Sequence, residues 1–546
     1  MKVAWRNLMK NKVFSSINIL GLTLGFTCCF LIGLYIQHEL SFDKYHTNHQ
    51  RIYRLATHVQ GSTYGEGIAK ISGPWAPAAK QAIPEIEDFT RFVMYGQALI
   101  KQGAEQIYEE GGFFADSSTF KVFSWKLING DAATALAEPN AVVLTESLAQ
   151  KLFGDSNPLG QTLNIGNEAV YKVTGVMQDP PPNSHFDFSF FVSLSTYRSE
   201  DLQSWTANNQ YYTYLLLKPG TSSEAVAKKV DNLLNSNLTK EDAKAYTPFL
   251  QLLPGIHLNS NLFREIGTNS DIKTIYIFGF IAFIILVIAC MNFINLTTAK
   301  AANRAKEVGV RKATGAGKSS LVKQFILESL MIGVIAGIVA LVLSSIFITP
   351  FGDLLDRELN FNIIENTAPF IFLFGLIIFT SILSSIYPAF VLSSFKPVKV
   401  LKGNFSFKSN STLRAGLVVF QFTLSIALIL AVLVIGSQMN YMRQKDLGFN
   451  KDQIITVPLQ DNGSVAKLDQ IINKVKAIPG VVSISASSNQ PGGNDWGIPY
   501  EAVGLSKDQQ PSMRCLVVDE NFLNTYNIKI ASGRGFLKEF ATDSGS

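Results

Sequence analysis

A small group of residues near the middle of the chain has residue types that suggest phosphate binding: Gly315-Ala316-Gly317-Lys318-Ser319. A P-loop reads G-x-x-x-x-G-K-[ST], because the backbone N–H groups of the loop wrap the phosphates and the lysine pairs with them. Gly317, Lys318 and Ser319 match the end of that pattern, but Lys312 stands where the first glycine is required. A long uncharged run precedes the group, instead of a short buried strand. We therefore expect no nucleotide-binding site in this chain.

The stretch around this group is strongly basic. Residues 300–323 carry seven Lys and Arg against one acid. Beside a membrane, such a segment either contacts only lipid headgroups or serves as a docking element for a protein partner. The candidate docking residues are the charged, small and apolar residues of this stretch: Arg304, Lys306, Glu307, Val308, Gly309, Arg311, Lys312 and Gly315.

Other reactive side chains form no recognisable site. Cys28, Cys29 and Cys290 lie in uncharged runs and Cys515 stands alone, which is typical of small buried hydrophobes. The six histidines show no metal-ligand spacing. No Ser/His/Asp, paired-carboxylate or Cys/His arrangement is evident, so we predict no catalytic site, no metal and no cofactor. The basic residues gather in short segments beside apolar runs, which gives no support for nucleic-acid binding.

The elements that must position these residues are membrane helices. Five runs of 24 residues or more contain no Asp, Glu, Lys or Arg: 13–38, 274–299, 329–352, 366–395 and 415–442. At 1.5 Å per residue the shortest gives about 36 Å of helix, enough to cross a hydrocarbon layer of about 30 Å. The first run is longer than the apolar part of a signal peptide and no cleavage site follows, so we expect an uncleaved anchor. Gln37, His38 and Glu39 end that run and are expected to anchor it at the interface.

Small and polar residues within the runs suggest how the helices pack. Gly21, Gly25 and Gly33 are expected to let neighbouring helices approach closely. Asn292 and Asn295 lie inside the second run, and we interpret them as interhelical hydrogen-bonding groups rather than a transport site.

Charge predicts the orientation. Residues 1–12, 300–323 and 393–414 are basic, whereas residues 353–365 carry four acids and only Arg357. Short basic segments stay in the cytoplasm. The N-terminus is then cytoplasmic, and the predicted order is a tail (1–12), a first span (13–38), an outside domain (39–273), a second span (274–299), a cytoplasmic segment (300–323), a third span (324–352), a short outside loop (353–365), a fourth span (366–395), a cytoplasmic linker (396–414), a fifth span (415–442) and a second outside domain (443–546).

The first outside domain has a mixed pattern. Short apolar stretches (141–144, 171–176 and 211–217) separated by Gly, Pro and Asn predict strands. Residues 145–153 predict a helix capped by Thr145 and followed by Gly154, and residues 222–238 predict an amphipathic helix. The predicted fold class is therefore an α-helical membrane protein with α+β extracytoplasmic domains.

Residues 414–449 repeat the layout of the N-terminus, a basic stub followed by a span and an outside domain. That second domain has strand signals at 454–459 and 481–485 and a helix signal at 465–478. A single span with a soluble tail is one interpretation of this region. We favour one complete unit, up to about residue 410, followed by the opening of a second, so that the chain is a fragment or an early-terminated product.

Several stretches resemble the MacB/FtsX-like permeases of ABC transporters. They include residues 1–21 (MKVAWRNLMKNKVFSSINILG), 41–55 (SFDKYHTNHQRIYRL), 140–163 (NAVVLTESLAQKLFGDSNPLGQTL), 171–188 (YKVTGVMQDPPPNSHFDF) and 304–329 (RAKEVGVRKATGAGKSSLVKQFILES). The plan of one span, a large outside domain and three further spans is also that of the family. The stretches at 140–163 and 171–188 resemble its periplasmic core domain, and 304–329 resembles its cytoplasmic segment between the second and third helices.

The resemblance implies a permease in a bacterial inner membrane that docks an ABC ATP-binding subunit, a separate polypeptide, through the eight candidate residues. ATP-driven closure of that subunit would move the helices and the outside domain mechanically, to export or extract a peptide, a lipoprotein or an amphiphilic compound. Further implied partners are a periplasmic adaptor with an outer-membrane duct, a lipoprotein or a hydrolase, and a second permease unit in a dimer or pseudo-dimer. Two alternatives stay open: a non-transporting regulator of a cell-wall hydrolase, and a sensor of antibiotic peptides.

Overall fold

The computed structural model describes residues 12–543 except 60–66, 104, 167–168, 200–201, 207–209, 300–307, 309, 311, 316, 360–366, 394–410, 460–461, 493–495, 500–511 and 541–542. The chain divides into two units. A helical unit comprises Met1–Ser41 and Ser270–Gln444, and the other unit comprises Phe42–Asn269 and Lys445–Ser546. We refer to residues 42–269 as the α+β domain.

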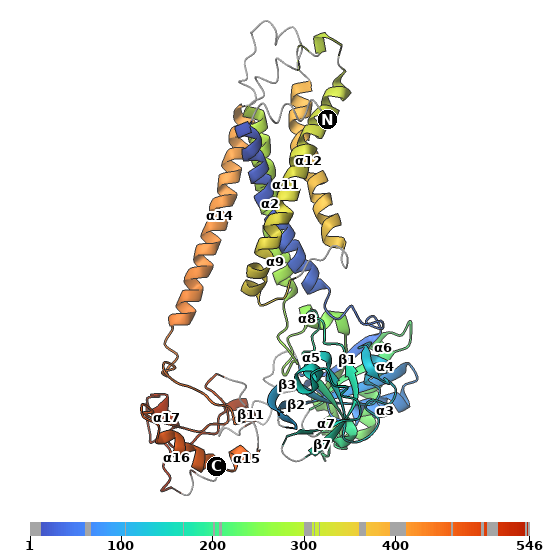
Figure 1. Cartoon of the computed structure of the whole chain (residues 1–546), viewed down its shortest axis with the longest axis vertical. Helices are drawn as coiled ribbons and strands as arrows, with labels where there is room; N and C mark the ends of the chain where they lie inside the picture. Colours follow the sequence, from blue (N-terminus) through green and yellow to red (C-terminus); the bar gives the residue numbers. More distant parts are fainter. Residues whose placement is uncertain are drawn as a thin grey trace. The chain divides into compact units, whose positions relative to one another are not determined.

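The helical unit contains five helices that are long and apolar enough to cross a membrane: α2 (Lys12–Leu40), α9 (Ile272–Ala299), α11 (Lys318–Leu355), α12 (Ala368–Ser393) and α14 (Ser411–Gln444). Each has a long apolar stretch with few charged residues, which a helix needs if lipid and other helices surround it. The first four run side by side as a bundle (Figure 1). No residue in the most apolar stretch of α14 is buried in this chain.

Glycines set the closest contacts between α2 and its neighbours. A methyl group added to Gly25 would lie 2.9 Å from Cβ of Ala289 on α9, and one added to Gly33 would lie 2.7 Å from the Phe372 ring on α12. A methyl group on Gly21 would lie 2.9 Å from the Asn292 side chain on α9. These distances are too short for a side chain, so the predicted role of these glycines in close helix packing is confirmed.

A second glycine pair, which the sequence analysis did not single out, joins α11 to α12. Gly333 and Gly337 are one helical turn apart, and added methyl groups would lie 2.7 Å from the Ser381 hydroxyl and 2.4 Å from Cδ1 of Ile377. A small-x-x-x-small pattern lets two backbones approach closely when lipid supplies no hydrophobic drive for association.

The α+β domain is built on one mixed sheet of ten strands. The strands are β1 (Ile52–Val59), β2 (Ile86–Gln102), β3 (Glu105–Ala115), β4 (Leu127–Gly130), β5 (Ala141–Thr145), β6 (Thr162–Ile165), β7 (Ala169–Met177), β8 (Phe190–Ser193), β9 (Tyr212–Leu217) and β10 (Tyr246–Leu252). Their order is β10-β1-β9-β2-β3-β8-β5-β7-β4, and β6 pairs with both β2 and β7. Only the β3–β8 and β5–β7 pairs are parallel.

The helices of this domain are α3 (Trp75–Ala82), α4 (Thr119–Val122), α5 (Glu146–Phe153), α6 (Ser223–Asn237), α7 (Lys240–Ala245) and α8 (Ile256–Asn259). The Thr145 hydroxyl accepts a hydrogen bond from the backbone N–H of Leu148, and Ser222 caps α6 in the same way through Ala225. Both caps satisfy N–H groups that a first helical turn leaves unpaired. The two helices predicted from the sequence are thus confirmed.

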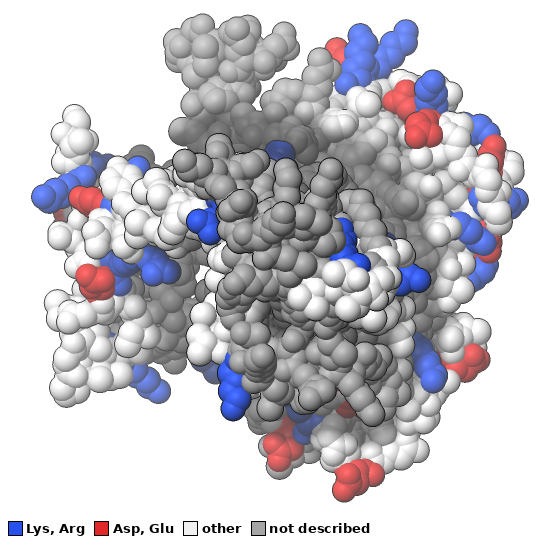
Figure 2. All heavy atoms as spheres, turned by 90° about the horizontal axis from the view of Figure 1, so that it is seen from above, with Lys and Arg blue, Asp and Glu red and all other residues white. Residues whose placement is uncertain are grey.

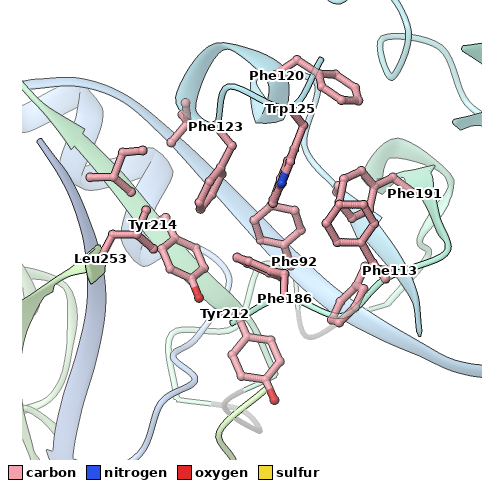
Figure 3. Packing of buried hydrophobic residues seen from close by; sticks show 14 of the residues in the cluster. Phe92, Phe113, Phe120, Phe123, Trp125, Phe186, Phe191, Tyr212, Tyr214 and Leu253 are labelled. Carbon is pink, nitrogen blue, oxygen red and sulfur yellow. The ribbon is translucent and has the colours of Figure 1, made fainter. Parts of the chain in front are cut away.

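An aromatic cluster fills the main core of the domain (Figure 3). Phe92 of β2 is fully buried and makes edge or tilted contacts with Phe113, Phe123, Trp125 and Phe186. Such geometries match the positive edge of one ring to the negative face of another, beyond the area that each ring buries. The residues of this cluster come from strands and loops spread over the domain, so the cluster fixes their mutual positions.

The segment after α14 differs from its prediction. In the described residues, 454–459 and 481–485 form no strand, and the helix signal at 465–478 is confirmed only over α16 (Leu468–Lys476). The short helices α15 (Asn462–Val465) and α17 (Phe522–Thr525) and the antiparallel pair β11 (Trp496–Pro499) and β12 (Ser512–Cys515) complete it. Val482 is fully exposed and Ile455 is 88% exposed. Residues with high strand propensity stay irregular here because no neighbouring strand among the described residues pairs with them.

Candidate functional site

The candidate docking segment lies between α9 and α11. Of its eight named residues, the structure describes Val308, Lys312 and Gly315. The other five lie outside the described residues: Arg304, Lys306, Glu307, Gly309 and Arg311. Val308 is 4% exposed, whereas Gly315 is exposed and Lys312 is half-buried. Among the residues coloured by charge in Figure 2, Lys and Arg are interspersed with Asp and Glu, and they form no large field of one sign.

The described part of the segment is a tight corner between two helices. Val308, Val310, Lys312 and Ala313 are helical, and the N–H of Thr314 donates to the carbonyl of Val310 at 3.0 Å. Gly315 then adopts φ +99°, a conformation that a glycine reaches without steric cost. Gly317 is the N-cap of α11 and has no side chain with which to cap it. The corner therefore places Lys312 shortly before a 38-residue helix.

This geometry differs from that of a P-loop. A P-loop follows a buried strand and closes around phosphates with successive backbone N–H groups. The described residues before Gly315 are helical instead. Lys318 begins α11, as a P-loop lysine would begin its helix, but without the preceding strand.

Helix α11 carries a buried carboxyl group that the sequence analysis missed. Glu328 is 7% exposed, and its Oε1 accepts a hydrogen bond of 3.0 Å from Gln324, one turn earlier. At 1.5 Å per residue it lies about 15 Å along the helix from Lys318. The predicted third span, 324–352, contains Glu328, but the sequence analysis gave it no role because it weighed only the charge-free run from residue 329. The Gln–Glu spacing of four is a recognisable helical pair. An ionisable group at such a position is a candidate for a functional role.

The other end of α11 is tied to α2 by an ion pair. Nε of Arg357 donates to Oε1 of Glu39 at 2.7 Å, and the Glu39 side chain is fully buried. Asp356 has φ +52°, and the N–H of Arg357 donates back to the carbonyl of Gly352 at 3.0 Å. A side chain on Gly352 would lie 2.5 Å from the Arg357 carbonyl, so only glycine allows this turn.

The structure gives Glu39 a partner that the sequence analysis did not expect. Its predicted position at the membrane interface stays a prediction, and its burial and its contact with Arg357 also make it a link between helices. A buried carboxylate is tolerated when a cation pairs with it and donates a hydrogen bond. Arg357 is the only basic residue in 353–365, which carry four acids, and that contrast was the sequence signal for the pair.

Polar side chains make further contacts between the helices. Nδ2 of Asn295 on α9 donates to Oε1 of Gln421 on α14 at 3.4 Å, which confirms its predicted interhelical role. The Thr23 hydroxyl on α2 donates to the carbonyl of Ala336 on α11 at 3.3 Å, and Sγ of Cys29 lies 3.3 Å from the carbonyl of Ala282 on α9. The Thr23 contact joins α11 to α2, Gly333 and Gly337 join α11 to α12, and the other two contacts join α9 to α2 and α14. A displacement applied at the Gly315 corner would therefore be shared by the bundle.

Comparison with known proteins gives this architecture a family context. Residues 15–233 match the MacB-like periplasmic core domain, and residues 279–397 match the FtsX-like permease C-terminal domain. The pyoverdine export ATP-binding/permease protein PvdT of Pseudomonas syringae pv. syringae (strain B728a) is 23% identical over 365 residues, which are 63% of this chain and 51% of PvdT. The macrolide export ATP-binding/permease protein MacB of Aggregatibacter actinomycetemcomitans is 26% identical over 243 residues, 44% of this chain and 34% of MacB. The chain thus spans about half, or less, of the length of these curated relatives.

Two solved structures are similar to part of the chain. A domain of a permease protein from Porphyromonas gingivalis has 24% sequence identity and a TM-score of 0.34, covering 41% of this chain and 95% of that domain. The periplasmic region of MacB from Actinobacillus actinomycetemcomitans has 18% identity and a TM-score of 0.29, covering 38% of this chain and 90% of that region.

Proposed function

Because the chain belongs to the MacB/FtsX-like permeases, we propose that it is the membrane-spanning permease of an ABC transporter and couples ATP hydrolysis by a separate ATP-binding subunit to movement of its extracytoplasmic domain. One observation carries the proposal. The two family matches occur in the order that the predicted topology requires, with the basic helical corner between α9 and α11 inside the FtsX-like match. The ATP-binding subunit docks on residues 304–315, including Arg304, Lys306, Arg311 and Lys312.

The coupling we propose is mechanical. Closure of the ATP-binding subunits displaces the corner at Gly315, and the tightly packed bundle transmits the displacement as a rigid body to the domain that α2 and α9 flank in the sequence. Transmission through a packed element with two discrete arrangements is an established mode of conformational coupling. The substrate class that fits is a large molecule handled on the outer side: a peptide, a lipoprotein or an amphiphilic compound. The names of two relatives, which describe export of pyoverdine and of macrolides, support export as the direction of movement.

The orientation belongs to the proposal. The N-terminus and residues 300–323 and 396–414 are cytoplasmic, and residues 39–273 and 443–546 are periplasmic. A membrane-impermeant maleimide applied to cells with a permeable outer membrane is expected to label the natural Cys515 but not a cysteine introduced by Lys408→Cys. Labelling of the introduced cysteine and protection of Cys515 would reverse the orientation.

Co-purification tests the docking. The full-length protein is captured from its native membrane, and its partners are identified by mass spectrometry in the natural protein and in Arg311→Glu/Lys312→Glu. We expect an ABC ATP-binding subunit that is lost in the double variant. A matched control, Lys402→Glu/Lys408→Glu, makes the same charge change on the same predicted side of the membrane and should retain the subunit. Recovery of no ATP-binding subunit with the natural protein would contradict the proposal and favour the sensor or hydrolase-regulator alternatives.

A further inference from the structure

The chain enters the α+β domain through a buried aspartate. Asp43 is only three residues beyond the end of α2 at Leu40, a span of at most about 11 Å. Its backbone N–H donates to the carbonyl of Asn183 at 2.9 Å, and its Oδ1 accepts the backbone N–H of His185 at 3.1 Å. Its Oδ2 lies 2.9 Å from Nδ1 of His185, whose Nε2 is 2.8 Å from the hydroxyl of Tyr214 on β9. Asp43 is fully buried, and its Oδ1 is satisfied by the backbone N–H of His185 while its Oδ2 faces the His185 ring.

Neighbouring aromatic residues reinforce this attachment. The ring of Phe42 stacks on that of His257 on α8, with centroids 3.4 Å apart. The Tyr45 hydroxyl donates to Oγ of Ser184 at 3.0 Å and accepts from Nε1 of Trp125 at 3.0 Å. We call residues 42–51 the leading segment. It is held at several points to the loop that contains residues 183–185, rather than lying free between α2 and β1.

The chain leaves the domain through a second buried network. Arg54 on β1 is fully buried, and its guanidinium forms an ion pair with Glu265. The same guanidinium donates to Oγ of Ser260 at 2.7 Å and to Oε1 of Gln251 at 2.6 Å. Burial alone would raise the pKa of Glu265, but the hydrogen bonds and charge of Arg54, with hydrogen bonds from Ser260 and the backbone, hold that pKa below its usual value. The carboxylate is therefore ionised at neutral pH.

The network extends almost to α9. Nδ2 of Asn269 donates to the carbonyl of Ser260 at 3.0 Å, and Asn269 is three residues before α9 begins at Ile272. We call residues 260–269 the trailing segment. Since Arg54 lies on the strand that directly follows the leading segment, its contact with Glu265 also joins the trailing segment to β1. Each segment is thus fixed to the domain within three residues of a membrane helix.

Backbone conformation marks both attachment points. Asp43 has φ +58° and Arg264, which precedes Glu265, has φ +61°. Residues other than glycine avoid this left-handed region, and they hold it only where surrounding contacts fix them there. At both points the unusual backbone delivers a carboxylate to its buried partner.

We propose that Asp43 and Glu265 are positioning residues that fasten the leading and trailing segments to the sheet, so that a displacement of α2 or α9 moves the α+β domain as a body instead of being absorbed by slack linkers. This inference rests on the proposed function, because it assigns residues to the transmission of movement. Neither residue contacts a substrate or a nucleotide in this role.

A third buried carboxylate offers a matched control. Asp88 on β2 is 4% exposed and forms ion pairs with Lys80 and with Lys121, whose Nζ lies 2.7 Å from its Oδ2. Removal of its charge should cost the domain stability, as removal of Asp43 or Glu265 would. Asp88, however, is distant in sequence from the leading and trailing segments. An effect on transmission that is seen for Asp43 and Glu265 but not for Asp88 therefore cannot come from lost stability alone.

The test uses the full-length protein with its captured ATP-binding subunit in lipid nanodiscs. Hydrogen exchange by mass spectrometry is measured with and without ATP for the natural protein and for Asp43→Ala, Glu265→Gln and Asp88→Asn. We expect faster exchange in the leading segment for Asp43→Ala and in the trailing segment for Glu265→Gln. In both variants the subunit still binds, but the ATP-dependent change in exchange across the β2–β3 hairpin is lost. Asp88→Asn should retain the ATP-dependent change. Asp43→Asn keeps an oxygen that can accept the backbone N–H of His185, so it should show the ATP-dependent change that Asp43→Ala loses.

Two results would overturn the inference while leaving the proposed function in place. In the first, Asp43→Ala and Glu265→Gln transmit the ATP-dependent change as the natural protein does. In the second, Asp88→Asn loses it equally, so that general stability explains the effect. If the natural protein captures no ATP-binding subunit, the proposed function fails. Even in that case, unchanged hydrogen exchange in the leading segment of Asp43→Ala and in the trailing segment of Glu265→Gln would exclude the proposed attachment of these segments.

Discussion

In the helical unit glycines bring neighbouring helices close together, whereas in the α+β domain aromatic rings and buried ion pairs fill the core. Gly337 packs against Ile377 with no room for a methyl group, while Phe92 lies among six other aromatic side chains and Arg54 is fully buried against Glu265. The difference follows from the solvent. Lipid gives helices no hydrophobic reason to associate, so close backbone packing and hydrogen bonds must do it, whereas water drives large apolar side chains together.

The same difference bears on transmission of movement. Close backbone packing makes the helices difficult to displace separately, and a packed aromatic core with fixed polar networks makes the domain difficult to deform. Both parts are suited to move as bodies. The short segments at the ends of α2 and α9 are then the places where movement would be lost or conveyed, which is why buried carboxylates there are of interest.

The largest expected effect is that of Arg54→Met on the α+β domain. Removing one partner of a buried ion pair leaves the other charge unpaired, and we expect a loss of about 3–5 kcal/mol in the free energy of unfolding. Hydrogen exchange of β1 in the full-length protein measures it. The double variant Arg54→Met/Glu265→Met removes both charges and should recover part of the loss; equal destabilisation in the single and double variants would show that the pair itself is unimportant.

A smaller effect is expected for Gly337→Ala in the bundle. The added methyl group would lie 2.4 Å from Cδ1 of Ile377, and overpacking of this kind costs about 1–3 kcal/mol. Gly375→Ala is the matched control, since no atom lies within 4 Å of its added methyl group. Thermal unfolding in detergent should show a lower midpoint for Gly337→Ala only. If both variants behave alike, glycine packing does not hold α11 against α12.

A pH dependence is expected from His46. Burial lowers the pKa of His46 to about 3, with a smaller opposing effect of Asp43 and small contributions from His185 and His49 that also lower it. Between about pH 6.5 and pH 3 the unfolded histidine, with a pKa near 6.5, is protonated, whereas the folded histidine is neutral. The free energy of unfolding of the domain therefore falls as the pH drops from about 6.5 towards 3, by at most about 1.4 kcal/mol per pH unit. His46→Gln should flatten this slope, measured by hydrogen exchange of the leading segment. If the slope is unchanged in His46→Gln, the pH dependence of stability comes from titratable groups other than His46.

The smallest effect is expected on α14. Phe422 is 62% exposed in this chain, and Phe422→Ala should change bundle stability by less than about 0.5 kcal/mol. Phe26 on α2 is fully buried, so the same substitution there should cost several times more. Thermal unfolding of the two variants in the same detergent compares them, and equal losses would contradict the exposed position of α14.

Much of the fold could be read from the sequence because it depends on local signals. The five apolar helices, the caps at Thr145 and Ser222 and the close packing at Gly25 all follow from composition or from spacing within a few residues. Partners distant in the chain could not be read in this way. Glu39 and Arg357 are 318 residues apart, and only folding shows that they meet.

The candidate site was predicted less completely. Glu328 was given no role because the spans were found as runs without charged residues, whereas α11 tolerates a carboxylate that is buried beside Gln324. The strands expected at 454–459 and 481–485 were wrong, since strand propensity needs a pairing partner before it forms a strand. The roles of Arg311, Lys312 and the other docking residues stay predictions.

The most direct test of the account is whether ATP changes the extracytoplasmic domain of the natural protein at all. The full-length chain with its captured ATP-binding subunit is placed in nanodiscs, and hydrogen exchange of residues 42–269 is compared without nucleotide, with ATP and with ADP-vanadate. The account predicts a nucleotide-dependent change in this domain that is absent from Arg311→Glu/Lys312→Glu. Identical exchange in all three nucleotide conditions, with the subunit bound and hydrolysing ATP, would contradict mechanical coupling.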